Sequence, residues 1–266
     1  MKNVILLLSL AFITFCNNGT AIASEPVYMG LNGQFNSVEI TYYTGFDKRT
    51  VKTKPFGNFQ RKEVYTFDNA GYLSEKLTYA DLAKKTLTAK DTYKRDKNGR
   101  AIEIYSGDNL NDSHYIIETL WRMIKKVGNV EQWQKINDND SWGTSFQRIE
   151  YLGNKKETKS YVVQTKDKEV STQRITTEIF NERGLVTSET VERGGSHPKN
   201  TTIKTYNDKG HLLKDELVQV YNDGSSSKTE NASYTIDKVD AHGNPLQVTN
   251  DRGDIKIYKY SYRAIQ

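Results

Sequence analysis

The sequence predicts an all-β protein, an antiparallel meander of about eight hairpin repeats. Two observations indicate this fold. A turn motif recurs along the chain at nearly regular spacing, and apolar and polar residues alternate in the segments between the turns. In addition, 17 tyrosines and only 4 prolines among 266 residues are typical of strand-rich exported proteins.

The N-terminus has the features of a secretory signal peptide. Lys2 supplies a positive charge, an apolar run extends from Val4 to Phe15, and small residues flank Ile22 in Ala21-Ile22-Ala23. The run is shorter than the roughly 20 residues that a membrane-spanning helix needs. We therefore expect residues 1–23 to be removed after Ala23, leaving residues 24–266 as a β-hairpin repeat domain in the periplasm or outside the cell. The alternatives are a buried helix or an uncleaved anchor.

Cys16 offers a second processing scheme, lipid attachment as in bacterial lipoproteins. The bulky Phe15 stands where a small residue normally precedes the modified cysteine, so this scheme is the less favoured one. If Cys16 leaves with the signal peptide, the mature chain has no cysteine. Disulfides, a thiolate nucleophile and Cys-ligated metals are then excluded.

The charge pattern argues against nucleic-acid binding. The net charge is only +5, and basic pairs such as Lys84-Lys85 and Lys155-Lys156 have acidic residues close by. Binding to phosphates calls for a basic block instead. A solvated, charged sheet face is the favoured interpretation, and we expect no transmembrane segment in the mature chain.

The repeated motif is an aromatic residue, then Asp or Asn, two further residues and Gly. Clear copies are Phe67 to Gly71, Phe180 to Gly184 and Tyr206 to Gly210, and looser copies are Arg95 to Gly99 and Val239 to Gly243. Weak members centre on Gly45, Gly128 and Gly153, and the eight glycines are 25 to 33 residues apart. The motif residues predicted to build the turns are Asp68, Gly71, Asp96, Gly99, Asn181, Gly184, Asn207, Gly210, Asp240 and Gly243.

The motif has a direct physical explanation. The Asp or Asn side chain accepts a hydrogen bond from the backbone two residues later, and Gly adopts the left-handed conformation that closes a hairpin with a bulge. Each repeat should therefore be two antiparallel strands joined by a tight turn.

The segments between the turns alternate with the period of a half-buried strand. Val38, Ile40 and Tyr42 alternate with polar residues, and so do Ile102 and Ile104. Near the C-terminus, Ile255 and Ile257 alternate with a row on the opposite face, Tyr258, Tyr260 and Tyr262.

Two segments are ambiguous. Residues 113–127 fit both a helix and a strand, and the strand is favoured because Gly128 keeps the repeat in phase. A short helix is an alternative at residues 80–85.

About sixteen strands of roughly ten residues cannot remain a flat open sheet, because strand twist accumulates. We expect the meander to curl into an open barrel or trough, with a β-sandwich as the alternative. Unpaired edges of such a sheet would allow self-association into a dimer or filament.

The motif, with an apolar residue soon after the glycine (Leu73, Ile102, Val186, Leu212, Leu246), resembles the tyrosine–aspartate (YD) repeat of RHS-type bacterial surface proteins. The resemblance spans about residues 38 to 262, and Tyr206 to Gly210 matches best. It implies β architecture and an envelope or surface setting. For the repeats of that family carbohydrate binding has been proposed, and no catalytic residue is carried over.

Chemistry-bearing motifs are absent from the sequence. The four histidines, His114, His197, His211 and His242, have no metal-ligand spacing, and no G-x-S-x-G elbow supports a Ser-His-Asp triad. Residues 138–143 resemble a calcium loop, but Trp142 stands at a ligand position and the bidentate Glu is missing. We therefore expect no catalytic residue, metal or cofactor, and no enzyme, with an exported hydrolase as the least favoured alternative.

Trp121, Trp133 and Trp142 lie within 22 residues, where the repeat is least regular. They are the candidate ligand-binding residues, because indole rings stack on sugars and bury well at contacts. The alternative is that they fill the core where the sheet curls.

Two functions follow as hypotheses. The first is a non-enzymatic envelope or surface protein whose repeats form a binding surface for a glycan or protein partner. The second is a periplasmic carrier that holds a lipid or another apolar ligand on a curled sheet.

Overall fold

The computed structural model describes residues 31, 33–45, 57–108, 117–136, 143–195 and 197–263. The predicted all-β antiparallel meander is confirmed, and the described chain contains no helix. The predicted signal peptide and its cleavage site lie outside the described residues.

Sixteen strands follow one another along the chain. Their bounds are β1 Phe35–Thr44, β2 Asn58–Phe67, β3 Leu73–Tyr79, β4 Leu87–Arg95, β5 Ala101–Asp108, β6 Ile117–Val127, β7 Val130–Lys135, β8 Gly143–Leu152, β9 Lys155–Gln164, β10 Val170–Phe180, β11 Val186–Arg193, β12 Lys199–Tyr206, β13 Leu212–Val220, β14 Ser226–Val239, β15 Pro245–Asn250 and β16 Ile255–Tyr262. Each strand pairs with its neighbours in sequence, so the topology is a plain meander.

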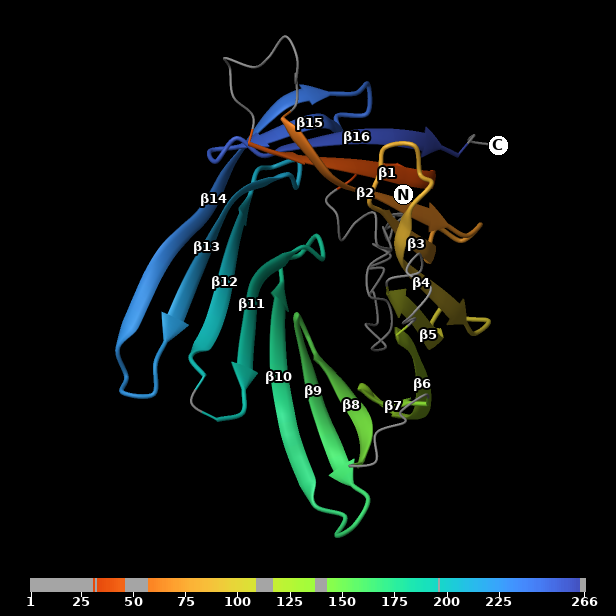
Figure 1. Cartoon of the computed structure of the whole chain (residues 1–266), viewed down its shortest axis with the longest axis vertical. Coiled ribbons are helices and arrows are strands. Elements are labelled where there is room, and N and C mark those ends of the chain that lie inside the picture. Colours follow the sequence, from red (N-terminus) through yellow and green to blue (C-terminus); the bar gives the residue numbers. More distant parts are fainter. Residues whose placement is uncertain are drawn as a thin grey trace, which may run out of the picture.

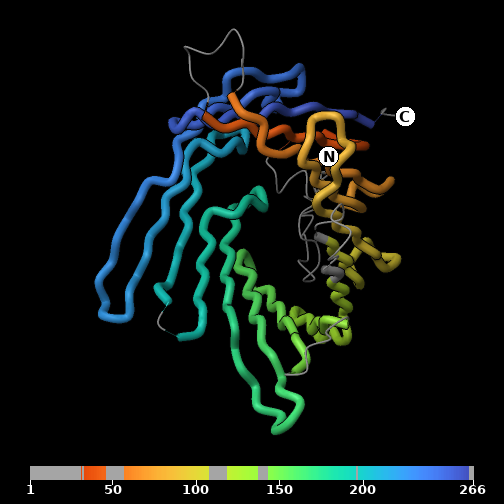
Figure 2. The backbone as a smooth tube through the Cα atoms, viewed as in Figure 1, coloured from red at the N-terminus to blue at the C-terminus, as the bar shows by residue number. Residues whose placement is uncertain are grey.

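The ring of strands is closed, because β1 pairs with β16 in antiparallel register from Phe35–Tyr262 to Tyr43–Ile255. Figures 1 and 2 show β1 and β16 side by side at this joint. The expected open barrel or trough, and the alternative sandwich, differ from this closed arrangement. Closure lets the outermost strands of a long twisted meander satisfy each other's backbone groups, and every described strand is paired on both sides.

The tight turns of the five clear and looser motif copies lie on one rim of the barrel. The turns after β2, β4, β10, β12 and β14 share one geometry, which Asp68 illustrates. Its Oδ1 accepts hydrogen bonds from the backbone N–H groups of Ala70 and Tyr72, both at 2.9 Å, and the Gly71 N–H donates to its carbonyl. The glycines of these five turns have φ between 76° and 87°, so they occupy the left-handed region.

The remaining repeat glycines divide between the rims. Gly128 and Gly153 start the two-residue turns after β6 and β8, in phase with the five turns above. Gly45 follows β1 and therefore lies at the opposite rim. That rim also holds two tight turns that the motif search missed, in which Gly224 donates to the Tyr221 carbonyl and Gly253 to the Asn250 carbonyl.

The two ambiguous segments resolve differently. Residues 117–127 form β6, and residues 113–116 lie outside the described chain. Residues 80–85 are a turn instead of a helix. There Asp81 accepts hydrogen bonds from the backbone N–H groups of Lys85 and Thr86, and Lys84 has a φ of 59°.

Strand register divides the side chains between two faces. We call the face that carries Tyr42 the tyrosine face and the other the ion-pair face. On the joined strands the tyrosine face carries Val38, Ile40 and Tyr42 of β1, Arg61, Glu63 and Tyr65 of β2, and Lys256, Tyr258, Tyr260 and Tyr262 of β16. The pairing of β1 with β16 thus places two predicted rows on the same face: Val38, Ile40 and Tyr42 on β1, and Tyr258, Tyr260 and Tyr262 on β16.

The principal apolar core lies at the joint of the two chain ends, which we call the seam (β16, β1, β2 and β3). Phe35, Val38, Ile40 and Leu73 are at most 3% exposed. Phe35 contacts the rings of Tyr260 and Tyr262, with centroids 5.5 and 5.0 Å away. The hydrophobic burial that holds the ring together is therefore concentrated where the two chain ends meet.

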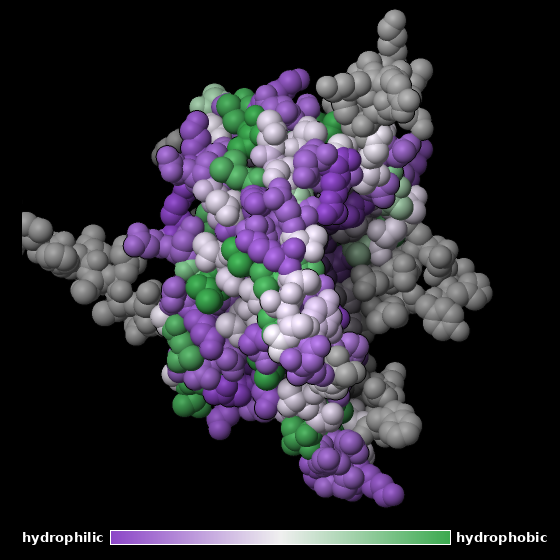
Figure 3. All heavy atoms as spheres, turned by 90° about the vertical axis from the view of Figure 1, so that its left-hand side faces the viewer, coloured by the Kyte–Doolittle hydropathy of each residue, from purple (hydrophilic) through white to green (hydrophobic). Residues whose placement is uncertain are grey.

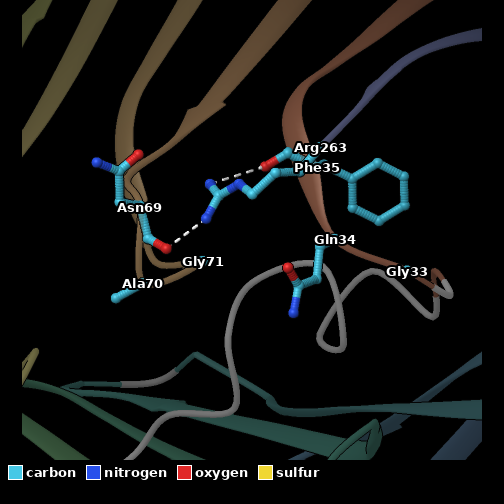
Figure 4. Close-up of a pocket in the computed structure, with 7 residues that line it drawn as sticks. All are labelled: Gly33, Gln34, Phe35, Asn69, Ala70, Gly71 and Arg263. Carbon is cyan, nitrogen blue, oxygen red and sulfur yellow. Dashed lines mark hydrogen bonds between the residues drawn. The ribbon is translucent and has the colours of Figure 1, made fainter. Parts of the chain in front are cut away.

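Arg263, just after β16, connects strands of the seam through hydrogen bonds. Its guanidinium donates hydrogen bonds to the carbonyl of Asn69 in the turn after β2 and, at 3.4 Å, to the carbonyl of Phe35 (Figure 4). These residues, with Gly33, Gln34 and the turn residues 70 and 71, line a shallow pocket of about 170 Å³.

Candidate functional site

The most elaborate polar cluster in the described chain surrounds Glu63, in the middle of β2 on the tyrosine face. Glu63 is 6% exposed. Its carboxylate accepts hydrogen bonds from the Tyr42 hydroxyl at 2.8 Å and the Tyr65 hydroxyl at 2.7 Å. Arg61 donates at 3.0 Å, and the Lys76 ammonium lies 3.7 Å away. We call these five residues the Glu63 cluster.

Strand geometry explains how these side chains meet. Arg61, Glu63 and Tyr65 alternate along β2 and so share its tyrosine face. Tyr42 of β1 lies opposite Arg61, and Lys76 of β3 lies opposite Tyr65. Cross-strand and diagonal neighbours on one face are within reach of long side chains, which brings three strands together on one carboxylate.

The electrostatics of the cluster favour a charged carboxylate and neutral phenols. Burial by itself would raise the pKa of Glu63, but the hydrogen bonds from Tyr65 and Tyr42 and the charge of Lys76 hold that pKa below its ordinary value. Burial and the neighbouring carboxylate raise the pKa of Tyr42 and of Tyr65 well above the ordinary value for tyrosine. Both hydroxyls therefore remain protonated donors, which is unsuited to nucleophilic or general-base chemistry by the tyrosines.

Cations lie against the tyrosine rings of this face. The Arg61 guanidinium lies 4.0 Å from the centroid of the Tyr42 ring. The Lys256 ammonium lies 5.7 Å from the Tyr42 centroid and 5.3 Å from the Tyr234 centroid. Burial and the nearby Arg61 charge lower the pKa of Lys256. The face thus combines flat aromatic surface with charged groups.

A second, weaker cluster surrounds Glu131 of β7 and contains one of the predicted tryptophans. Trp133 is 4% exposed, and its indole N–H donates to Glu131 at 3.3 Å. The ammonium of Lys126 and the guanidinium of Arg100 lie 3.3 and 3.8 Å from the same carboxylate. The Trp133 ring is therefore buried in the barrel wall beside the Glu131 carboxylate.

Of the other two predicted tryptophans, Trp121 lies on the same strand face as Trp133 and is its diagonal neighbour across β6 and β7. Trp121 is half-buried on the tyrosine face of β6, opposite Lys135. Met123 of β6, not Trp121, is the residue opposite Trp133. Trp142 lies outside the described residues.

The predicted turn residues are spread around the barrel rim, one pair per turn, so they do not converge on a site. Asp96, Asn181, Asn207 and Asp240 each accept the backbone N–H two residues later, at 2.8 to 3.0 Å. Adjacent turns are tied together in places. Arg183 donates to the carbonyls of Asp208 and Lys209 at 2.6 and 2.9 Å, which links two consecutive turns.

The histidines and the calcium-like segment form no metal site in the described chain. His211 is buried at the rim, and the ring of His242 lies against that of Tyr262, tilted by 38° with centroids 4.3 Å apart. His114 and residues 138–142 lie outside the described residues. Among the described residues, no group of three or more His, Cys, Asp or Glu could hold a metal ion, and no helix could cross a membrane.

The sequence search did not single out the Glu63 cluster. One available signal was the alternation in Arg61-Lys62-Glu63-Val64-Tyr65, which puts two charges and an aromatic ring on one strand face. The row of Tyr258, Tyr260 and Tyr262 was recognised, but its neighbour β1 comes from the other end of the chain. Only closure of the ring brings them together.

Comparisons with known proteins return fold neighbours alone. No protein-family model and no curated protein matches the chain. Two crystal structures of porin-like proteins are similar, both at 11% identity. The protein from Bacteroides uniformis ATCC 8492 has a TM-score of 0.38, and the match covers 85% of this chain and 96% of that one. The protein from Bacteroides vulgatus ATCC 8482 has a TM-score of 0.42, with 88% and 100% covered. The resemblance to YD repeats stays a prediction.

Proposed function

We propose that the chain is an exported, non-catalytic envelope or surface barrel that binds a polar partner, a glycan or a protein, on water-exposed strand faces. The observation that carries this proposal is the presence of ion pairs on both faces of the barrel wall. Since one face of a closed barrel must point outward, charged side chains meet whatever surrounds the barrel.

Each face contributes its own set of pairs. The tyrosine face has the Glu63 cluster, and on it Lys156 contacts Glu178 at 2.7 Å. On the ion-pair face, Glu103 contacts Lys94 at 3.1 Å and Arg122 at 2.8 Å. Three further residues of that face, Lys214, Glu216 and Lys228, form a chain of contacts at 3.0 to 3.2 Å.

On the side of the barrel seen in Figure 3, hydrophilic and hydrophobic side chains are interspersed. Such a surface suits a polar partner with many hydrogen-bonding groups. It gives little support to the carrier hypothesis, which needs a continuous apolar trough, because the seam core is covered by its own aromatic neighbours.

A second candidate is a pore of the bacterial outer membrane. It is favoured by the closed ring of 16 strands, since barrels of 16 to 18 strands enclose an aqueous channel, and two fold neighbours are described as porin-like. Two observations weigh against it. A lysine or arginine facing lipid at the bilayer centre costs about 2–4 kcal/mol, and β7 and β15 have only six residues each, fewer than the 9–11 of a spanning strand.

A vesicle flotation experiment separates the two candidates. The mature chain, residues 24–266, is mixed with vesicles of phosphatidylethanolamine and phosphatidylglycerol and centrifuged through a density gradient. We expect the folded protein to remain at the bottom with the soluble fraction. Flotation with vesicles, together with protection from added protease, would overturn the proposal and support the pore.

Partner capture tests the second half of the proposal. The labelled mature chain is applied to an array of immobilised glycans and, in parallel, cross-linked to proteins of its own envelope fraction. We expect saturable binding in one of the two assays. Binding in neither would contradict a partner-binding function.

A further inference from the structure

Three side chains on the tyrosine face lie beside the Glu63 cluster without belonging to it: Asp215 of β13, Tyr234 of β14 and Lys256 of β16. The Tyr234 hydroxyl is 3.5 Å from Oδ2 of Asp215, and the Lys256 ammonium is 5.3 Å from the centroid of the Tyr234 ring. Their strands follow one another around the ring, with β15 between the last two (Figure 1).

Asp215 and Lys256 attract each other at longer range, but each has a polar group without a direct partner among the described residues. Oδ1 of Asp215 is buried and has no hydrogen-bond partner among the described residues, although Lys204 lies opposite Asp215 in the register. Lys256 makes ring contacts with Tyr42 and Tyr234, and among the described residues its ammonium forms no ion pair. A buried polar group without a partner is destabilising, by roughly 1–3 kcal/mol for a typical case.

The needs of the two groups are opposite, and both groups lie next to Tyr234, Asp215 at its hydroxyl and Lys256 at its ring. The Asp215 oxygen requires a hydrogen-bond donor, while the Lys256 ammonium requires an acceptor. The Tyr234 ring offers a flat apolar surface. A ligand that fits all three must carry donors and acceptors on one compact ring that also has an apolar C–H face.

We propose that Asp215, Tyr234 and Lys256 form a subsite for one hydroxyl-rich sugar ring of a glycan, an inference that rests on the proposed function. One sugar hydroxyl donates to Oδ1 of Asp215, and another accepts from the Lys256 ammonium. The C–H face of the sugar packs against the Tyr234 ring. Burial and the charge of Arg61 lower the pKa of Lys256, while the carboxylates of Asp215, Glu63 and Asp254 act in the opposite direction.

The test uses an array of immobilised polysaccharides and oligosaccharides, probed with the labelled mature chain and its variants. Asp215→Asn and Lys256→Met should each weaken binding to the recognised glycans by about tenfold or more, since each removes a charge-assisted hydrogen bond. Tyr234→Phe keeps the ring and should have a smaller effect. Glu216→Gln and Lys259→Met, on the same strands but on the opposite face, are the matched controls and should bind as the unmodified chain does.

Circular dichroism and thermal melting check that each variant folds, and if Asp215→Asn does not, Lys256→Met carries the test. If the unmodified chain binds glycans and both site variants bind equally well, the subsite is wrong while the proposed function stands. If it binds no glycan but cross-links to an envelope protein, the subsite is likewise wrong and the function is that of a protein-binding barrel.

Discussion

The seam and the wall of strands β7–β10 are built from the same antiparallel pairing but are stabilised differently. Four residues of β1 are buried, whereas every residue of β9 is half-exposed. The seam uses aliphatic and aromatic side chains, while the β7–β10 wall relies on pairs such as Lys156–Glu178 and the stacked rings of Phe146 and Tyr161.

The reason lies in the length of chain that each pairing closes. Most strand pairs are hairpins between neighbours in sequence, but β1 and β16 join residues as far apart as Phe35 and Tyr262. Because loop-closure entropy grows with the logarithm of loop length, this joint costs about 3 kcal/mol more than a short hairpin. Burying two or three large apolar side chains offsets that cost, at about 1.5–3 kcal/mol each. Apolar burial is therefore placed where closure is most costly.

The largest expected effect tests this difference directly. Phe35→Ala should lower the free energy of unfolding by about 3–5 kcal/mol, because it empties the seam core. Phe146→Ala in the β7–β10 wall should lower the free energy of unfolding by about 1 kcal/mol. The Phe146 ring is half-exposed, so its loss removes less buried surface. Urea unfolding followed by tryptophan fluorescence measures both. Equal losses would show that the seam is no more important than the wall.

The two buried glutamates give the next comparison. Glu63→Gln should destabilise the protein by about 2–3 kcal/mol, because it leaves Arg61 and Lys76 without their shared carboxylate and weakens two tyrosine hydrogen bonds. Glu131→Gln should cost less, since the hydrogen bond from Trp133 is longer, at 3.3 Å. Urea midpoints of the two variants decide the order. A larger loss for Glu131→Gln would reverse our ranking of the clusters.

The rim turns allow a finer comparison between two glycines of the same repeat motif. Gly71 and Gly99 both have a left-handed φ, so alanine at either position costs about 1 kcal/mol in backbone strain. A Cβ at Gly71 would meet open space, but one at Gly99 would lie 2.2 Å from the Tyr72 ring. Gly99→Ala should therefore melt at a lower temperature than Gly71→Ala. Identical melting temperatures would mean that Tyr72 moves aside freely.

The smallest expected effect is a dependence on pH at the rim. Burial and the nearby charges of Lys209 and Arg183 lower the pKa of His211 below its ordinary value of 6.5. The unfolded chain then binds a proton more readily than the folded one, so stability is lost as the pH falls through 6.5 and the loss levels off below the folded-state pKa. In His211→Asn, the melting temperature should fall less between pH 7 and pH 5.5 than it does in the unmodified chain. If the melting temperature of the variant changes with pH as much as that of the unmodified chain, other titratable groups cause the pH dependence.

Several features of this protein follow from the sequence by itself. The Asp or Asn and Gly of each motif copy predict the rim turns because the turn geometry is local, and the alternation of Val38, Ile40 and Tyr42 predicts a strand with two unlike faces. These inferences need only neighbouring residues. The turns at Gly224 and Gly253 were missed because they lack the full motif, although their Asn and Asp residues carried the signal.

Tertiary structure alone decided what depends on distant parts of the chain. Whether the meander remained open or closed depended on β1 meeting β16, and no local pattern encodes a pairing between residues more than two hundred positions apart. The same applies to Tyr42 and Lys256, which contact each other only because the ring closes. Turns and strand faces arise from contacts within a few residues, whereas closure and the sites that depend on it arise from the accumulated twist of all sixteen strands.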